Sequence, residues 1–435
     1  MRLSPRPWAI IALLCLMATG RAATAEHLLE ATPVHPVSSL QMGSDPAELR
    51  FLDRSLDGVR VLSLGEVLHG YKESLELRNR LFQFLVETHG FTAIAAETGF
   101  VEGTAVDDYI IGKGELTEQL VRNVFSFNSS AGWQENRRLL EWMRAYNARS
   151  TTKRKLRFYG IEMLGHVNYV RDADRVHLRK AADFALDYLQ RVDPVLAASW
   201  RARFEPLLAA LVASRYEALP STDRDALTLA TADLVSLFER RHVEWLASSS
   251  SEAYHRAHRS AVNARNLDAD LRATGWWTPT PRRNGDIAQR DAAMAQSVLW
   301  ALDRQGADGK LMVFSANGHA SRDAGRGEPV CLEATSCSHA MGSHLHQQLG
   351  RQMLIVAMID RRTAVPDRRL DELWASTRPA MFAVDFSALT TSGPAQQWWQ
   401  SLTWYEADLR TRLPLIQNFD VAFFFDGLSK ATPLH

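Results

Sequence analysis

The 435-residue sequence predicts an α/β fold, with a mostly parallel sheet flanked by helices and a large helical insertion that forms a second lobe. Short runs rich in β-branched and aromatic residues recur along both halves of the chain and indicate buried strands. Amphipathic helical segments lie between these runs, which is the spacing of βαβ units with parallel strands. A long stretch in the middle of the chain has helical patterns and no convincing strand, and it predicts the insertion.

Residues 1–25 have the features of a Sec-type signal peptide. MRLSPRP carries two arginines, the apolar run WAIIALLCLMATG follows, and Ala23-Thr24-Ala25 matches an A-x-A-like cleavage site. The apolar run is shorter than the roughly 18 residues of a membrane-spanning helix, and no later segment approaches that length. We therefore expect a periplasmic or secreted protein with no integral membrane segment after signal cleavage. An uncleaved N-terminal anchor is the alternative.

Residues 26–170 form the first half of the predicted α/β core. Its strands are expected in VRVLSLGE, FTAIAAETG and KLRFYGIE, each bounded by turn or polar residues. Between the first two lies ESLELRNRLFQFLVETHG, a predicted helix with an apolar face and with Gly90 as its C-terminal stop. A second helix, around QENRRLLEWMRAYNAR, leads into the third strand.

Residues 171–275 are predicted to form the helical insertion, and residues 276–435 the second half of the core. The insertion contains charged and Ala/Leu-rich segments such as KAADFALDYLQRV and DALTLATADLVSLFERRHVEWL. Trp276 and Trp277 follow it, where they either line an apolar substrate wall or pack at the domain junction. The core then resumes with the helix RDAAMAQSVLWALDR and the strands KLMVFSANGH, QMLIVAMID, AMFAVDF and FDVAFFFD.

The charge balance, the motifs that are missing and the cysteines indicate which partners and cofactors to expect. The chain has 50 basic and 50 acidic residues, and removal of the signal peptide leaves 47 basic residues because Arg2, Arg6 and Arg21 are lost. Without a basic patch we expect no nucleic-acid partner, and without a G-x-G-x-x-G or P-loop motif we expect no nucleotide cofactor. A small-molecule substrate fits better. Cys331 and Cys337 remain after export and either form a disulfide or stay as separate thiols.

Polar residues fall where several predicted strands end. VRVLSLGE ends on Glu66 and is followed by His69, FTAIAAE ends on Glu97, FYGIE ends on Glu162, and MVFSANGH ends on Asn317 and His319. In an open parallel sheet, sites lie at the carboxyl ends of strands. We therefore expect these carboxylates and imidazoles to gather at one edge of the sheet.

His69 is the candidate general base, because an imidazole with a pKa of about 6.5 is largely unprotonated at neutral pH and can accept a proton. Glu66 or Glu97 is the candidate to orient the ring or to stabilise the imidazolium. Arg78, on the following helix, is a candidate to neutralise the carboxylates or to stabilise an oxyanion, and its alternative role is that of a surface arginine.

Arg290 and Asn317 are the candidate substrate-binding residues. Arg290 lies near the start of a helix after the insertion and is followed by Asp291. A carboxylate in the first turn of a helix is stabilised by the helix dipole, so the position of Asp291 also has an explanation that involves no site. Asn317 directly follows a predicted strand, beside the residues that carry the chemistry.

The stretch GEVLHGYKESLELRNRLFQFLVETHGFTAIAAETGFVEGTAVDDYIIGKG resembles the N-terminal signature of the erythromycin esterase family in its motifs and their spacing. FYGIE, RDAAMAQSVLW, ANGH, MGSHL and FDVAFFFD resemble further segments of that family, so the resemblance spans most of the mature chain. It implies an esterase-like hydrolase that cleaves a macrolide lactone ester by attack of water. In the family, a histidine base assists the water, without a covalent serine intermediate and without a metal or other cofactor.

The resemblance extends to individual residues. The family's Glu-x-x-His pair corresponds to Glu66 and His69, its helix arginine to Arg78, its second-strand glutamate to Glu97 and its late histidine to His319. It implies that His69 takes a proton from water while the other four hold the base, the water and the oxyanion. Resistance esterases of the family can carry His-Asn-x-His in the late motif. Here Ala316 stands at the first position, a departure that bears on the macrolide substrate more than on hydrolysis.

The sequence also bears on other chemistries. A serine triad is not expected, because the chain has no G-x-S-x-G elbow and because Ser63 and Ser315 lie within or at the ends of strands. A metal-dependent hydrolase, such as a peptidase or amidase, is an alternative, since the carboxylates and imidazoles of the site are ligand types for a divalent metal. A non-catalytic exported protein for binding or polysaccharide assembly is a second alternative. The intact set of five site residues favours an enzyme.

Overall fold

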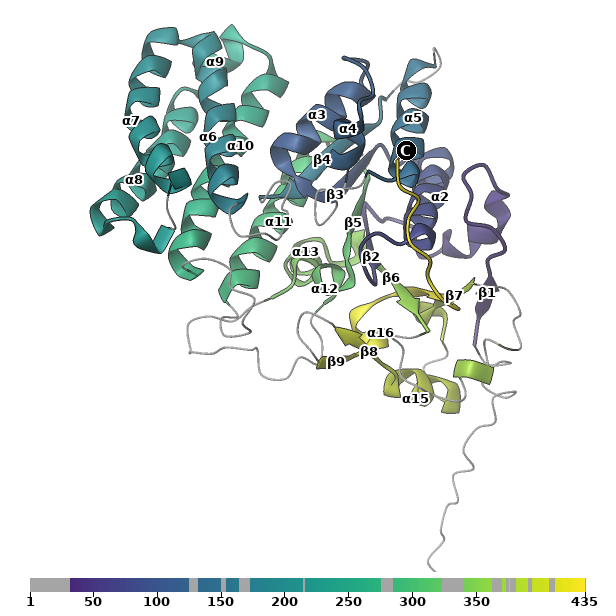
Figure 1. Ribbon diagram of the computed structural model, residues 1–435. Helices are drawn as coiled ribbons and strands as arrows, with labels where there is room; N and C mark the ends of the chain where they lie inside the picture. Colours follow the sequence, from purple (N-terminus) through teal and green to yellow (C-terminus); the bar gives the residue numbers. More distant parts are fainter. Residues whose placement is uncertain are drawn as a thin grey trace, which may run out of the picture.

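An eight-stranded sheet forms the centre of the protein in the computed structural model (Figure 1). The structure describes residues 32–124, 132–149, 154–163, 173–213, 216–274, 285–322, 339–361, 370–372, 375, 381–389, 393–406 and 411–434. In spatial order the strands are β1 (Val34–Pro36), β7 (Met381–Asp385), β10 (Val421–Phe425), β6 (Met353–Asp360), β2 (Val61–Glu66), β5 (Leu311–Ala316), β3 (Ala93–Gly99) and β4 (Arg157–Glu162). The six adjacent strands from β10 to β4 all run parallel to one another, whereas β7 runs antiparallel to both β1 and β10.

This architecture confirms the predicted α/β class, because each of the seven runs expected to be a strand forms part of the sheet. The residues of each strand alternate between two cores. Leu62 and Leu64 of β2 face one hydrophobic cluster, and Val61 faces the other. Such alternation is the two-residue period of a strand whose two faces are both covered.

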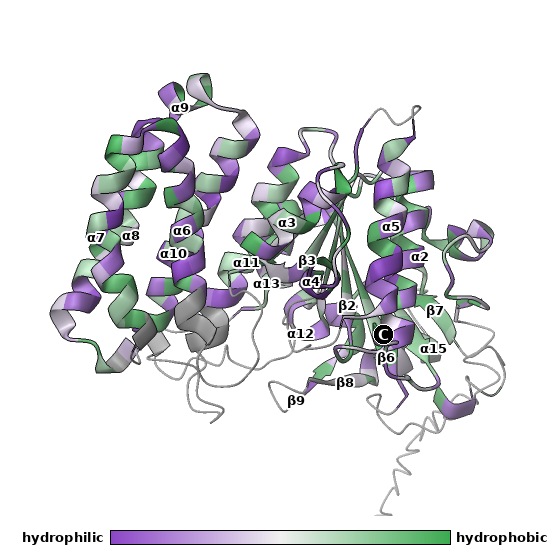
Figure 2. Ribbon diagram, turned by 45° about the horizontal axis from the view of Figure 1, so that its top comes forward, coloured by the Kyte–Doolittle hydropathy of each residue, from purple (hydrophilic) through white to green (hydrophobic). Residues whose placement is uncertain are grey.

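Helices cover both faces of the sheet. The first face is packed by α2 (Lys72–His89) and α5 (Gln134–Ala148), and the second by α11 (Gly285–Arg304) and α13 (Met341–Leu349). Figure 2 shows green, hydrophobic strands enclosed by helices with mixed purple and green surfaces. Gly90 ends α2 with a left-handed φ of 71° and an N–H bonded to the Leu85 carbonyl, so its predicted role as a helix stop is confirmed.

A separate helical lobe stands beside the sheet in Figure 1. It consists of α6 (Ala173–Val192), α7 (Pro194–Ala213), α8 (Ser221–Arg240), α9 (His242–Ser248) and α10 (Ser251–Thr274), which enclose a hydrophobic cluster of their own. An ion-pair network joins α10 to the core, since Arg157 Nη2 lies 2.7 Å from Asp107 Oδ2 and Arg256 also pairs with Asp107. These helices are the predicted insertion.

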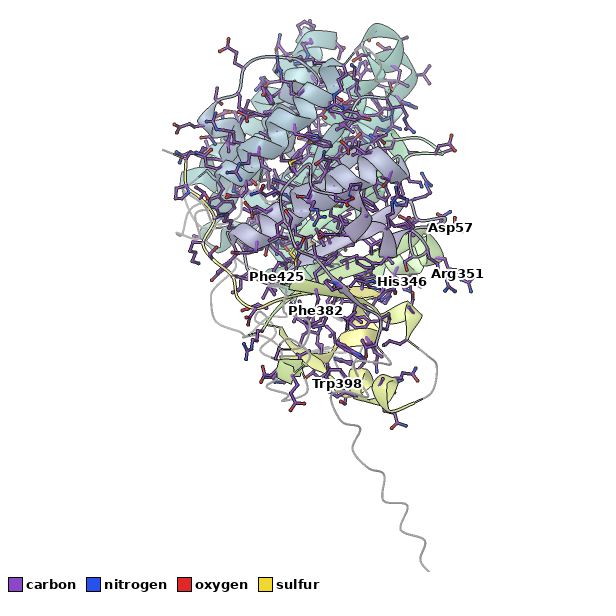
Figure 3. All side chains as sticks on the ribbon, turned by 90° about the vertical axis from the view of Figure 1, so that its right-hand side faces the viewer. Asp57, His346, Arg351, Phe382, Trp398 and Phe425 are labelled. Atoms are coloured by element: carbon purple, nitrogen blue, oxygen red, sulfur yellow. The ribbon has the colours of Figure 1, made fainter. Side chains whose placement is uncertain are left out.

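Smaller elements complete the fold. They are α3 (Phe100–Ile110), α4 (Glu118–Asn123), α12 (Asn317–Ala320), α15 (Pro394–Ser401) and α16 (Leu415–Asn418), the hairpin of β8 (Thr403–Glu406) and β9 (Thr411–Pro414), and 3-10 helices at Pro46–Leu52, Tyr216–Ala218, Gly350–Gln352 and Phe386–Ala388. In Figure 3, Phe382 and Phe425 mark the β7 and β10 end of the sheet, and Trp398 marks α15 below it.

Several sequence predictions fall outside the described residues. They are the signal peptide at 1–25, Trp276, Trp277, Cys331 and Cys337. Within the part of the chain that the structure describes, no helix is both long enough and apolar enough to cross a bilayer.

Candidate active site

The predicted carboxylates meet at one edge of the sheet. Glu66, Glu97 and Glu162 lie at or near the carboxyl ends of β2, β3 and β4, and each is 1% exposed. The strands stand in the order β2, β5, β3, β4, so β5 and its following helix α12 lie between Glu66 and Glu97. Beside Glu97 the pairing of β3 with β4 shifts register between Ala96 and Gly99, an irregularity that can redirect a side chain.

His69 is held by Glu66. The loop after β2 returns the imidazole toward the strand end, and His69 Nδ1 lies 2.8 Å from Glu66 Oε1. The pair fits an Nδ1–H that donates to the carboxylate, which leaves the lone pair on Nε2. The His69 side chain is 22% exposed, while the Glu66 side chain is 1% exposed. Glu66 is therefore a buried orienting group, and His69 is the member of the pair that a small molecule can reach.

The pKa values of this pair follow from burial and charge. Burial lowers the pKa of His69, but the hydrogen bond to Glu66 and the charges of Glu97 and Glu66 outweigh it, so the pKa is raised above its ordinary value. Burial raises the pKa of Glu66 in spite of His69 and Arg78. His69 is thus a stronger base than a free imidazole, as suits a group that must take a proton from water.

Arg290 organises the second half of the site. Its guanidinium places Nε 2.6 Å from Glu162 Oε2, Nη2 2.8 Å from Glu97 Oε1 and Nη1 2.8 Å from His319 Nε2. The planar fork of an arginine suits such a role, because it holds several acceptors in fixed directions. Three separate segments of the chain are therefore joined by one side chain from the first half of α11.

The neighbouring residue on α11, Asp291, orients His319. Asp291 Oδ1 lies 2.7 Å from His319 Nδ1 and also accepts a hydrogen bond of 2.8 Å from the backbone N–H of Met341. Asp291 is fully buried. His319 thus repeats the arrangement of His69, an imidazole whose Nδ1 faces a buried carboxylate, on the other side of the site.

Glu97 and His319 have strongly shifted pKa values. Burial raises the pKa of Glu97, but His319, His69, Arg290 and the Ala316 N–H outweigh it and lower the value to about 2. Burial lowers the pKa of His319, yet Asp291 and Glu97 outweigh both burial and Arg290 and raise it to about 9. Glu97 is therefore a carboxylate at any physiological pH.

The contact between His319 and Arg290 needs the neutral imidazole, because an arginine only donates hydrogen bonds. The acidic surroundings nevertheless favour a proton on the same nitrogen. Proton uptake at His319 Nε2 therefore requires Arg290 Nη1 to move away, and Glu97 Oε1, at 3.6 Å, is the acceptor within reach of the new N–H. His319 can in this way alternate between accepting from Arg290 and donating to an anionic partner.

Arg78 lies under the site and not on its surface. It is 0% exposed, donates to Asn79 Oδ1 at 2.8 Å and to Asn136 Oδ1 at 2.9 Å, and packs over the Phe314 ring. Burial lowers its pKa to about 10, against the charges of Glu66 and Glu135. Its charge acts on Glu66, but its side chain has no exposed surface with which to touch a substrate.

Asn317 is likewise placed against the sheet. Its Nδ2 donates to the Met358 carbonyl at 2.7 Å, and the residue is 3% exposed. A Cβ at Gly65 would lie 2.3 Å from Asn317 Oδ1 and 2.9 Å from Asn317 Cα, so only glycine lets α12 pack this closely on β2. Asn317 therefore anchors the helix that carries His319.

Three contributors to the site had no role predicted from the sequence. Glu162 was expected at the sheet edge and Asp291 at the start of a helix, although α11 already begins at Gly285. Their partners lie 128 and 28 residues away along the chain. Asn136, which holds Arg78, carried no sequence signal beyond its place in an amphipathic helix. Within the described residues, no three His, Cys, Asp or Glu side chains are arranged to hold a metal ion, and the carboxylates contact Arg290 and imidazoles instead.

Sequence comparisons match this chain to one protein family. The family model "Erythromycin esterase" matches residues 86–426. Erythromycin esterase type II of Escherichia coli is 26% identical over 309 residues, which cover 69% of this chain and 68% of the relative. Erythromycin esterase type I of Escherichia coli is 24% identical over 314 residues, with 69% and 70% covered. The family match begins after Glu66, His69 and Arg78.

Solved structures share the fold. A Bacillus cereus protein has a TM-score of 0.74 at 18% identity and covers 95% of this chain and 100% of its own. A succinoglycan biosynthesis protein has a TM-score of 0.70 at 18% identity, with 94% and 98% covered. A mutant of the erythromycin esterase EreC in its open conformation has a TM-score of 0.65 at 17% identity, with 92% and 98% covered.

Proposed function

Because this chain belongs to the erythromycin esterase family, we propose that it is a hydrolase that cleaves an ester bond by attack of water, with a macrolide lactone as its candidate substrate. The observation that carries the chemistry is the pairing of His69 with buried Glu66 at a distance of 2.8 Å. This pair stands at the carboxyl edge of a parallel sheet, where sites of such folds lie.

In the proposed reaction His69 Nε2 takes a proton from a water molecule, and the resulting hydroxide attacks the ester carbonyl carbon. Glu66 stabilises the imidazolium through the Nδ1–H bond. Collapse of the tetrahedral intermediate breaks the bond to the alcohol oxygen, which takes up the proton from His69. The products are an alcohol and a carboxylic acid, which then loses its proton to water, and no covalent bond to the protein forms.

Arg290 and His319 are the proposed partners of the oxyanion. Their side chains are 15% and 9% exposed, so both reach the surface of the site. Arg290 carries several N–H groups that can donate, and His319 can donate from Nε2 when that nitrogen is protonated. Glu97 and Asp291 hold these two groups in place and balance their charge. Arg78, which is fully buried, is proposed to act on Glu66 by its charge alone. We propose no metal or other cofactor.

The direct test compares the mature protein with His69→Ala and with His89→Ala as a matched control. His89 also faces a carboxylate, Asp53 at 3.0 Å, but lies at the far end of α2. Each protein is incubated with macrolides and simple aryl esters, with and without chelator, and products are followed by mass spectrometry. We expect a gain of one water, unaffected by chelator, in the parent and in His89→Ala but not in His69→Ala.

Other outcomes of the same assay identify the alternatives. Turnover of aryl esters alone would support the histidine-assisted mechanism and exclude a macrolide as the substrate. Turnover that chelator abolishes would favour a metal-dependent hydrolase. The absence of turnover with every substrate would favour the non-catalytic binding protein.

Export is part of the proposal and rests on residues 1–25. We propose a periplasmic or secreted enzyme in which Cys331 and Cys337 form a disulfide. Cell fractionation followed by N-terminal sequencing is expected to find the chain beginning after Ala25. Thiol alkylation before and after reduction is expected to label the two cysteines only after reduction.

A further inference from the structure

A segment at residues 428–434, here called the strap, crosses the loop that carries His69. The strap follows β10 and pairs Lys430 with Tyr71 in an antiparallel bridge. Ala431 N–H donates to the Gly70 carbonyl at 2.9 Å, and Lys72 N–H donates to the Ser429 carbonyl at 2.9 Å. In Figure 1 the strap is the yellow trace that climbs from the sheet past α2 to the chain end beside α5.

The strap also supplies a hydrogen-bond acceptor for the start of α2. The N-cap residue Tyr71 makes no side-chain capping bond, although the first N–H groups of a helix need acceptors. The Ser429 carbonyl accepts from the first of these, Lys72 N–H. Glu73 in the first turn in turn accepts from Ser429 N–H at 2.7 Å and from the Ser429 hydroxyl. The helix start and the strap thus hold each other.

The strap continues onto a second segment beside the loop. Gln134 N–H donates to the Thr432 carbonyl at 2.8 Å, and Leu434 N–H donates to the Gly132 carbonyl at 2.9 Å. Between them Trp133 packs against Gly70, where a Cβ would lie 2.8 Å from the indole. Gly70, the residue after His69, has a left-handed φ of 77°, a conformation that favours glycine. It contacts the strap through its carbonyl and Trp133 through its Cα.

The same contacts lead to Arg78. Thr432 N–H donates to Glu135 Oε2 at 3.2 Å, and the Glu135 carbonyl accepts from Asn79 Nδ2 at 2.8 Å. Asn79 Oδ1 accepts from Arg78, whose charge acts on Glu66. The strap therefore reaches the His69–Glu66 pair from two directions, through the backbone of the loop and through the buried side chains below it.

We propose that the strap is a positioning device for His69, which caps α2 and holds the Gly70 backbone so that the imidazole stays over Glu66. Its residues touch no substrate and act through the loop. The catalytic meaning of the strap rests on the proposed function, whereas its effect on the position of His69 does not.

The test uses Glu73→Gln and Ala431→Pro in the full chain. The first removes one of two acceptor oxygens for Ser429, and the second removes the N–H that binds the Gly70 carbonyl. Glu76→Gln is the matched control, because Glu76 lies one turn further along α2 and pairs with Arg138 instead of the strap. Glu73→Gln decides the outcome if Ala431→Pro fails to fold.

The first readout is the titration of the His69 imidazole by NMR on histidine-labelled protein, with the signal assigned by its loss in His69→Ala. In both strap variants we expect the His69 pKa to fall toward its ordinary value of 6.5. Amide exchange of residues 67–72 is expected to quicken about tenfold, as loss of a hydrogen bond to a charged group implies. Glu76→Gln is expected to match the parent in both. Unchanged titration and exchange in Glu73→Gln would overturn the proposal.

The second readout is turnover of whichever ester the parent cleaves. A loosened base is expected to lower kcat about tenfold with KM within about twofold, since the strap does not touch the substrate. If no ester is turned over while the His69 titration shifts as expected, the proposed function fails and the positioning role stands. If turnover is found but His69 titrates alike in parent and strap variants, the proposed function stands and the positioning role fails.

Discussion

Replacement of Arg290 by methionine is the most informative single change, because this side chain neutralises two buried carboxylates at once. Its Nη2 lies 2.8 Å from Glu97 and 2.6 Å from Glu162, both of which are 1% exposed. Removing one partner of a buried ion pair leaves an uncompensated charge, which costs about 3–5 kcal/mol of the free energy of unfolding.

That cost corresponds to a measurable fall in Tm. An unfolding entropy of about 2.1 cal/mol/K per residue, over a chain of this length, amounts to about 1 kcal/mol/K. We therefore expect Arg290→Met to lower Tm at pH 7 by about 3–5 °C, in a calorimetric scan in which the chain unfolds as one unit. The loss should be smaller at pH 5, because the unpaired carboxylates can then take up protons.

Two further variants make the test specific. Adding Glu162→Gln to Arg290→Met removes one of the unpaired charges and is expected to restore part of the lost Tm. Arg272→Met is the control, since Arg272 pairs with Asp225 on the exposed surface of the lobe and its loss should cost at most about 1 kcal/mol. An Arg290→Met protein with the Tm of Arg272→Met, or one that Glu162→Gln fails to rescue, would refute the reasoning.

Three other predictions follow from the same geometry. Glu66→Gln removes the charge that raises the pKa of His69, so the acid limb of the pH–rate profile and the NMR titration of His69 should both move to lower pH; an unmoved titration would contradict the pairing. Glu97 has a pKa of about 2 instead of 4.5, so its contribution to stability is present above pH 4.5 and lost as the pH falls toward 2; Tm measured against pH should fall less steeply over this range in Glu97→Gln than in the parent. Gly65→Ala places a Cβ 2.3 Å from Asn317 Oδ1. It should cost about 1–3 kcal/mol in urea unfolding, and an undiminished midpoint would show that α12 is not fixed against β2.

The strands and their carboxyl-end residues were predictable because both depend on local patterns. A buried strand of a parallel sheet is apolar on both faces, and the residue at which the pattern stops is visible in the sequence. Glu66, Glu97 and His319 were found in this way, as were the helix stop at Gly90 and the helical insertion. The family resemblance, now confirmed, agreed with the same positions.

Arg78 shows the limit of that approach. On the sequence it is one of several charged residues in an amphipathic helix, and a surface position was its alternative interpretation. The structure buries it completely because Asn79 and Asn136 accept its hydrogen bonds and Phe314 covers its face. Asn79 is its neighbour in α2, but Asn136 comes from α5 and Phe314 from β5, and no pattern within α2 encodes their approach.

The sequence by itself determined which residues end strands, which segments are helical, and that carboxylates and imidazoles meet at one sheet edge. Only the tertiary structure decided the pairs of Asp291 with His319 and of Arg290 with Glu97 and Glu162, and it decided for Glu66 over Glu97 as the hydrogen-bond partner of His69. Strand ends follow from local sterics and from the burial of neighbouring residues. A hydrogen-bond partner, however, depends on the order in which strands and helices pack. Glu97 and Arg290 lie 193 residues apart in the sequence. They meet because the hydrophobic core forms from elements of both halves of the chain.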